Sequence, residues 1–226
     1  MAYHSMLALP HDMIGYAATS GGQNLVPTFA SEPRLGANPH SWAIPALNMP
    51  PFILDISSSS IAAGKLGLLQ RLEKSVKPGL ISSKNGQPIM DHVPIPEDFF
   101  LLPLGSTPEM GSHKGYGLSA IAQIFGGILS SGSFGPTQGE QMTHFVTAYS
   151  IEAFTDLHKF KKSMDDFLQF LVETPPALGH ERVYYAGLRA HEEAKDRAKK
   201  GIPLHEEVVT WFDSIAIELG TEPLIR

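Results

Sequence analysis

Short apolar runs and amphipathic stripes follow one another along the chain, and their lengths predict alternating strands and helices. The runs "MIGYAAT" (13–19), "PPFILDI" (50–56) and "THFVTAYSI" (143–151) have the length and composition of β-strands. By the same criterion, shorter strands are expected at "LVPTF" (25–29), "FFLLPLGS" (99–106) and "RVYYAG" (182–187).

Helices are predicted where apolar residues recur every three or four positions. Such stripes indicate helices near 61–74, 117–130, 160–171, 189–199 and 208–219. The stretches "RLGANPHSWAIP" (34–45) and "GSFGPTQGE" (132–140) are predicted to be loops, because glycine and proline interrupt both patterns. Strands mixed with helices predict an α/β or α+β class, a mixed sheet with helices, and 226 residues suit one domain or two small ones.

Composition narrows the functions that this fold could serve. The net charge is −6 and no basic stripe is present, which argues against nucleic-acid binding. No apolar run approaches the roughly 18 residues that a membrane helix needs, and the first residues lack a basic leader, so a cytoplasmic location is expected. Cysteine is absent, which excludes disulfides and thiolate chemistry.

The stretch "GSHKGYGL" (111–118) places a lysine among glycines directly before a helix. A helix N-terminus favours anions, and Lys114 would add a full positive charge, so a phosphate site is one interpretation. A solvated lysine beside glycines that permit tight packing is the other. The letters "GYGLSA" also match a dinucleotide fingerprint, which requires a strand immediately upstream and an acidic residue about 20 positions later. Here the strand-like run "FFLLPLG" ends about ten residues too early, and the first acidic residue is Glu140, so a Rossmann site is not favoured.

Two further patterns bear on the chemistry. In "DISSSS" (55–60) a strand ends at Asp55 and a serine turn leads to a helix, which suits either a ribose or phosphate contact or ordinary N-capping by serine. The ten histidines show no metal-binding spacing, and no nucleophile elbow of the serine hydrolases is present.

The motifs taken together and in order resemble the malate/L-lactate dehydrogenase family of the second, non-Rossmann type. They are "DMIGYAAT", "LGANPHSWAIP", "PPFILDISSSSIAAGKL", "NGQPIMD", "LLPLG", "HKGYGLSAIAQIFGGILSSGSFG" and "GIPL". The resemblance implies that 1–226 is the cofactor-binding and C-terminal region of such a protein, with a non-Rossmann α/β NAD(P)-binding fold, and that it forms a homodimer. It also implies hydride transfer between NAD or NADP and a small-molecule 2-hydroxy or 2-oxo acid, without nucleic-acid or membrane partners.

The resemblance also implies which residues line the cofactor, because the matching positions can be carried over one by one. They are Ser20, Asn38, Asp55, Ile56, Ser57, Ser58, Ser59, Lys114, Gly115, Gly187, Leu188 and Arg189. Thr19 and Pro39 would lie near the same cleft. At two positions the chain departs from the family: Ala37 replaces a threonine, and the usual Pro-Gly-Glu turn reads "AGL" at 186–188.

The family's proton-transfer histidine and substrate-binding arginine lie in an N-terminal portion, and neither has a counterpart among these residues. His4 is near a family tyrosine position, so no catalytic residue is assigned, and no metal ligand either. We therefore expect one of three proteins. The first is a dehydrogenase represented by a chain truncated at its N-terminus. The second is a catalytically incomplete nucleotide-binding or dimerisation paralogue. The third is a remnant without a ligand.

Overall fold

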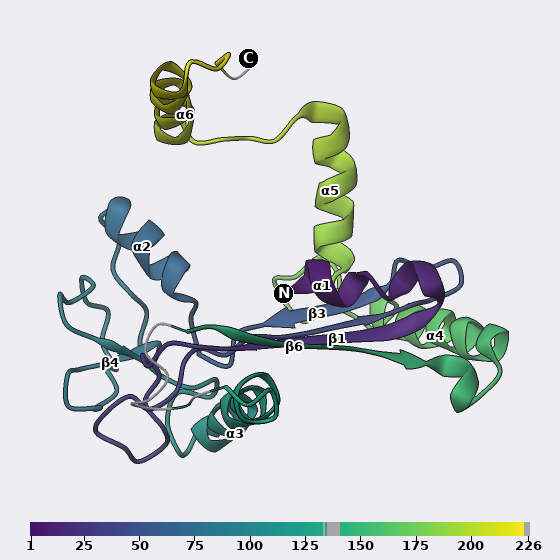
Figure 1. Ribbon diagram of the computed structural model, residues 1–226, viewed down its shortest axis with the longest axis horizontal. Coiled ribbons are helices and arrows are strands. Elements are labelled where there is room, and N and C mark those ends of the chain that lie inside the picture. The colour runs from purple at the N-terminus through teal and green to yellow at the C-terminus, as the bar shows by residue number, and fades with distance from the viewer. Residues whose placement is uncertain (133, 135–140, 224–226) are drawn as a thin grey trace. The chain divides into compact units, whose positions relative to one another are not determined.

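A computed structural model describes residues 1–132, 134 and 141–223 of the chain. It contains two compact units, Met1–Gly187 and Leu188–Arg226, which we describe separately (Figure 1). The predicted loop at 132–140 falls almost entirely outside the described residues.

A four-stranded antiparallel sheet forms the centre of the first unit, in the order β3-β2-β1-β6. The strands are β1 (Met13–Ser20), β2 (His40–Ile44), β3 (Phe52–Ile56) and β6 (Thr143–Ser150). β1 pairs with β6 along its whole length, from Met13 opposite Ser150 to Ser20 opposite Thr143. Strands distant in sequence thus become neighbours, which brings residues near positions 20, 55 and 144 into one sheet.

Helices cover both faces of this sheet (Figure 1). The short helix α1 (Ala2–Met6) packs on one face, where Gly15 lets it approach so closely that a Cβ there would lie 1.8 Å from the Ser5 carbonyl oxygen. The helix α3 (Ser112–Ala122) and the π-helix η2 (Gln123–Ile128) pack on the other face. There Tyr16, Ala18 and Ala122 form a small buried cluster with Trp42 and Phe145.

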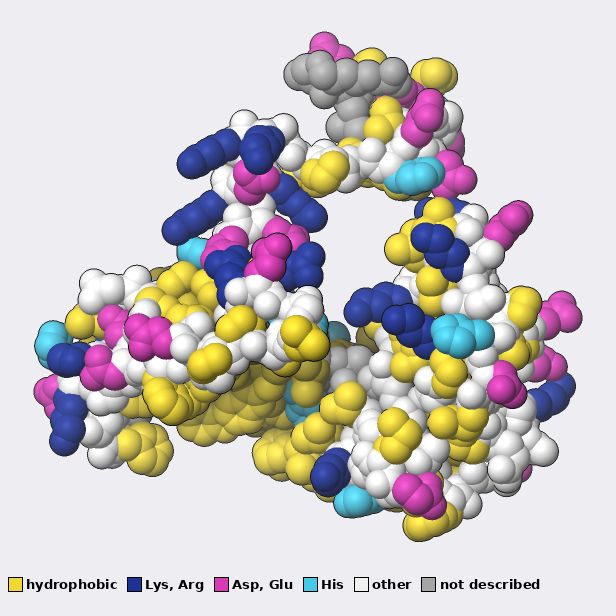
Figure 2. Space-filling view, turned by 180° about the vertical axis from the view of Figure 1, so that it is seen from behind, with side chains coloured by type: hydrophobic (Ala, Val, Ile, Leu, Met, Phe, Trp, Pro, Cys, Tyr) yellow, Lys and Arg dark blue, Asp and Glu magenta, His cyan; other side chains and the backbone are white. Residues whose placement is uncertain are grey.

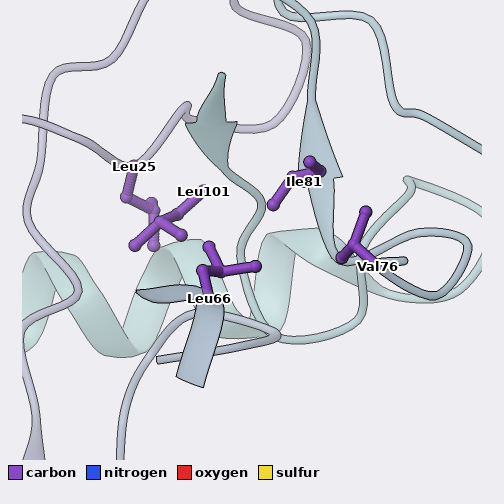
Figure 3. Close-up of a cluster of buried hydrophobic side chains, with 5 residues drawn as sticks. All are labelled: Leu25, Leu66, Val76, Ile81 and Leu101. Atoms are coloured by element: carbon purple, nitrogen blue, oxygen red, sulfur yellow. The ribbon is translucent and has the colours of Figure 1, made fainter. Parts of the chain in front are cut away.

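A second core lies beside the sheet and is built from loops, one helix and two very short strands. Its elements are α2 (Ala63–Arg71), β4 (Ile81–Ser82) and β5 (Phe100–Leu101). Figure 3 shows the five buried side chains that fill it, namely Leu25, Leu66, Val76, Ile81 and Leu101. Because these residues come from five separate segments, the core holds the loops on either side of α2 in place.

The long helix of the first unit, α4 (Leu157–Val172), carries a carboxylate that binds the turn at 47–49. Asp165 accepts hydrogen bonds from the backbone N–H groups of Leu47, Asn48 and Met49 at about 3 Å. Burial alone would raise the pKa of Asp165, but these bonds lower it below its ordinary value. The second unit contains α5 (Leu188–Lys200) and α6 (Glu206–Leu219).

The structure confirms the predicted combination of strands and helices and corrects it in several places. No regular strand forms at 25–29 or 182–187, and the run 99–106 supplies only two strand residues. The prediction of a loop at 34–45 is wrong, because residues 40–44 of this stretch form β2 and pair with β1. Alternate side chains of β2 point to opposite faces of the sheet, with His40 and Trp42 on one face and Ser41 on the other. Serine does not cap α2: its N-cap is Ala62, because the serines are bonded elsewhere.

Candidate functional site

Lys114 is the third residue of α3, and its side chain folds back toward the N-cap residue Gly111. Gly111 has φ 92°, a conformation that glycine adopts without strain. The first backbone N–H groups of the helix are largely occupied: Ser112 donates to Thr107, Lys114 to Gly111 and Gly115 to Leu104. Few backbone N–H groups at the start of α3 are therefore free to bind an anion. The exposed ammonium of Lys114 is the main group there that would attract one.

Gly115 lets α3 touch the segment at 103–105. A Cβ on Gly115 would lie 2.3 Å from the backbone nitrogen of Leu104, a distance that no real contact tolerates. Gly117, two residues later, faces open space. The glycine at 115 is thus needed for packing, and this contact sets the position of the lysine beside it.

The serines that follow β3 are hydrogen-bonded to the loop that contains Ala37 and Asn38. Ser58 donates from its backbone to Ala37 at 2.8 Å and from its hydroxyl to the Asn38 carbonyl at 2.8 Å. Ser57 and Ser59 share a 2.6 Å hydroxyl contact, and Ser59 also donates to the Ile61 carbonyl. These hydroxyls are engaged within the protein, so they shape the turn that follows Asp55.

Asn38 is the centre of a buried polar junction. Its Oδ1 accepts from the Gly21 N–H at 3.1 Å, and its Nδ2 donates to the Ser119 carbonyl at 3.0 Å. The residue is 1% exposed and has φ 31°, a left-handed conformation that asparagine tolerates better than most residues. Ser20 is equally buried and bonds Thr143 at 2.6 Å. Asn38 therefore joins the end of β1 to α3, and Ser20 joins β1 to β6.

His40 and Tyr16 form a second buried pair at this junction. Nε2 of His40 donates to the Leu118 carbonyl at 2.8 Å, since a carbonyl can only accept, and Nδ1 therefore accepts from the Tyr16 hydroxyl at 2.9 Å. Burial lowers the pKa of His40 and raises the pKa of Tyr16. The ring is held neutral in one tautomer and serves the packing of α3 on the sheet.

The opposite face of the sheet carries polar groups that remain partly open. Asp55, at the edge strand β3, accepts from the Ala2 N–H at 2.7 Å and from the Met1 amino group at 3.1 Å, both through Oδ2. Thr19 bonds Nδ1 of His144 at 2.8 Å, and His144 itself is exposed. Ile56 faces the α3 side, opposite His40 in the pairing of β2 with β3.

The predicted turn at 187–189 divides between the two units. Gly187, with φ 94°, closes the first unit: a Cβ there would lie 2.9 Å from the Cβ of Ile53. Leu188 and Arg189 begin α5 in the second unit, where Arg189 pairs with Glu193 at 2.9 Å. The structure therefore joins Gly187 to β3, and the contribution of Leu188 and Arg189 to a cofactor site stays a prediction.

Sequence reasoning missed three side chains: Tyr16, His40 and His144. His40 was hidden because β2 was predicted to be a loop, and the partner strand of β6 cannot be deduced from alternation alone. Across the described residues, no group of three or more histidine and carboxylate side chains is placed to hold a metal ion. Within the same residues, no helix is long and apolar enough to cross a membrane.

Comparisons with known proteins agree with this geometry. The sequence profile of the malate/L-lactate dehydrogenase family matches residues 1–212. A malate dehydrogenase of Pyrococcus horikoshii is 31% identical over 98% of this chain, and a malate/(S)-sulfolactate dehydrogenase of Methanothermus fervidus is 30% identical over 97%. The chain spans 63% of the length of each of these two relatives.

Solved structures give the same result. A malate dehydrogenase from Entamoeba histolytica superposes with a TM-score of 0.88 at 30% identity, covering 98% of this chain and 65% of the other. A sulfolactate dehydrogenase from Methanocaldococcus jannaschii superposes with a TM-score of 0.78 at 27% identity, covering 98% and 63%.

Proposed function

Because the chain belongs to the malate/L-lactate dehydrogenase family, we propose that it binds NAD or NADP and takes part in hydride transfer with a small 2-hydroxy or 2-oxo acid. The nicotinamide, when bound, accepts or supplies the hydride, and the protein binds and orients both partners. The observation that carries the proposal is Lys114, an exposed cation without an ionic partner among the described residues, at the start of a helix whose dipole also favours anions.

The residues present fit a dinucleotide in two respects. Lys114 would hold a phosphate group through a charge-assisted hydrogen bond. Asp55 keeps its Oδ1 without a partner in the described part of the chain, so this oxygen would accept from a ribose hydroxyl. Ser57, Ser58 and Ser59 would support the site indirectly, since their hydroxyls hold the turn that positions Asp55.

Fluorescence titration of the chain with NADH and NADPH tests the proposal. Lys114→Ala is expected to weaken binding by roughly 1–3 kcal/mol, the range for a hydrogen bond to a charged group. Lys159→Ala is a matched control, because Lys159 is also the third residue of its helix and also follows a histidine. An N-cap carboxylate, Asp156, occupies the start of that helix. Equal affinities in both variants would remove Lys114 from the site.

The alternative proposal is a catalytically incomplete paralogue that binds nucleotide or dimerises without turnover. The observation in its favour is that the hydroxyls of Ser57, Ser58 and Ser59 are engaged within the protein, so these residues shape a binding turn and leave no group there for a reaction. Absorbance at the nicotinamide band separates the two proposals: NADH consumption with oxaloacetate or pyruvate favours the dehydrogenase. Tight cofactor binding without consumption of NADH favours the paralogue.

We also propose that the chain forms a homodimer. Figure 2 shows hydrophobic side chains gathered into a broad patch over the part of the first unit that carries the sheet and α4. Exposed aromatic residues of this unit include Tyr149, Phe154, Phe167 and Phe170. Apolar surface of this extent marks interaction sites. Sedimentation equilibrium should give twice the chain mass of 24.5 kDa, and a monomer mass at micromolar concentration would contradict the dimer.

A further inference from the structure

We propose that the edge strand β6 is the contact surface of the homodimer, and that it pairs antiparallel with β6 of a second copy of this chain. The two four-stranded sheets then join into one continuous sheet. The inference rests on the homodimer proposed above and names the surface that forms it.

The two edges of the sheet differ in how their backbone groups are satisfied. At the β3 edge, the Ile53 N–H donates to the carbonyl of Ala186 at 2.9 Å, and Gly187 packs against the same residue. At the other edge β6 is bonded to β1, and the described part of the chain supplies no backbone hydrogen bond on its outer side. A strand of eight residues with an open edge is a template for pairing with another chain.

The register of the sheet identifies the backbone groups that remain open on β6. The Thr19 N–H donates to the carbonyl of Pro39, so odd-numbered residues of β1 bond β2 and even-numbered residues bond β6. Ser20 lies opposite Thr143, and the odd-numbered residues of β6 therefore bond β1. The N–H and C=O groups that point outward belong to the even-numbered residues of the strand, namely His144, Val146, Ala148 and Ser150.

β6 lacks the features that usually keep an exposed edge from pairing. Its sequence, "THFVTAYS", contains no lysine, carboxylate, proline or glycine, and it pairs with β1 residue for residue without a bulge. Val146 is 55% exposed and Tyr149 is 39% exposed, so the strand presents apolar surface beside its open backbone groups. Such an edge is suited to strand pairing.

A single antiparallel register pairs all four outward residues of β6 with those of a second copy. In this register Val146 lies opposite Ala148 of the second copy, and His144 lies opposite Ser150, so each outward N–H and C=O group gains a partner. The two-fold axis passes beside Thr147, which lies opposite the same residue of the second copy, as an isologous interface requires. Pairs of threonines stabilise antiparallel strands. The strand is therefore complementary to itself.

The α3 face of the sheet adds apolar contacts to this interface. The same register places Phe145 opposite Tyr149 of the second copy, and aromatic pairs of this kind are favourable across strands. Phe125 of η2 lies against Phe145, with ring centroids 4.9 Å apart, so η2 lies over β6. Ile124 and Ile128 of η2 are 50% and 51% exposed. Because paired edges bring both η2 helices to one face beside the axis, these side chains add to the buried area that a stable dimer needs.

A single cysteine at the two-fold axis tests the inference, because the chain contains no cysteine of its own. In Thr147→Cys the two thiols meet at a non-hydrogen-bonded pair, where Cα atoms are about 4.5 Å apart, a distance that a disulfide spans. Oxidised glutathione should therefore link the full chain into a covalent dimer on a non-reducing gel. Ala148→Cys is the matched control, since its two Cα atoms would lie about 7–8 Å apart on the diagonal, too far to bridge.

A charge at the same position gives a second readout that needs no oxidation. Thr147→Lys places two ammonium groups opposite each other, so sedimentation equilibrium should give the monomer mass of 24.5 kDa while the circular dichroism spectrum stays that of the folded chain. Thr155→Lys, at an exposed threonine beyond the end of β6, adds the same charge and should leave the dimer intact.

The outcomes separate this inference from the homodimer itself. If the wild-type chain has the dimer mass but Thr147→Cys is not cross-linked, the pairing of β6 is overturned and the dimer contact lies elsewhere on the chain. Cross-linking of Ala148→Cys to the same extent, or a dimer that persists in Thr147→Lys, overturns it as well. A wild-type monomer at micromolar concentration overturns both the inference and the proposed homodimer.

Discussion

The two faces of the four-stranded sheet carry similar polar side chains, which differ in burial and in the number of their hydrogen bonds. On the α3 face, Asn38 and His40 are buried and bonded through both ends of their side chains. On the α1 face, Asp55 and His144 are each bonded at one atom and open at another. A polar side chain whose donor and acceptor atoms are all bonded within the protein serves packing. In this sheet a polar side chain therefore indicates function only when one of its donor or acceptor atoms is free to bind a ligand.

The largest effect is expected where α3 meets the segment at 103–105. Gly115→Ala places a Cβ 2.3 Å from a backbone nitrogen, so the helix must shift, and unfolding in urea should show a loss of about 3 kcal/mol or more. Gly117→Ala, in the same helix but facing open space, should instead stabilise the chain by about 0.5–1 kcal/mol. Similar losses in both variants would contradict a tightly packed α3 face.

The next effect concerns the junction at Asn38. Asn38→Ala removes the bond to the partly buried Gly21 N–H and the buried bond to the Ser119 carbonyl of α3, and should cost roughly 2–3 kcal/mol in urea unfolding. Asn85→Ala, at an exposed turn, is the control and should stay within about 0.5 kcal/mol. A loss as small as the control's would mean that the α3 face does not depend on this junction.

A pH effect on stability should come from His40. Because burial lowers the pKa of His40, the unfolded chain binds a proton before the folded chain does as the pH falls below the ordinary value of 6.5. Its contribution to stability is complete above pH 6.5 and decreases toward lower pH, by at most about 1.4 kcal/mol per pH unit. Urea unfolding from pH 7.5 to 5 should show a shallower slope in His40→Gln, and an unchanged slope would refute the assignment.

The smallest effect on folding stability should come from the α1 face of the sheet. His144→Gln is expected to change the free energy of unfolding by less than about 0.5 kcal/mol, since the side chain is exposed and has one hydrogen bond to the protein. A loss above about 2 kcal/mol would place His144 with His40 among the structural residues.

Apolar runs and stripes predicted the long elements because local pattern and tertiary environment agree there. β1, β3, β6 and the helices from α2 onward occur near their expected positions. β2 was missed because its glycine- and proline-rich flanks are typical of loops, and its strand conformation comes from pairing with β1 and β3. The two-residue strands β4 and β5 have too little sequence of their own to be recognised.

The site was less predictable, since it depends on which strands become neighbours. The position of Lys114 at a helix start follows from its glycine-rich surroundings, and the structure adds that most of the adjacent N–H groups are already used. That Thr19 meets His144 follows from the pairing of β1 with β6, which no local pattern encodes. The internal bonding of the serine turn likewise depends on loops distant in sequence.

The pairing of β1 with β6 also has a consequence for how the chain folds. Until Thr143–Ser150 has been synthesised, β1 can pair with β2 alone, and its other edge stays open. Joining residues so far apart costs about 4 kcal/mol of loop-closure entropy, so this pairing is expected late and slowly. An uncovered strand edge on a nascent chain invites pairing with another chain. The sheet that bears the candidate site is therefore also open to wrong strand pairing with other chains while the protein is being synthesised.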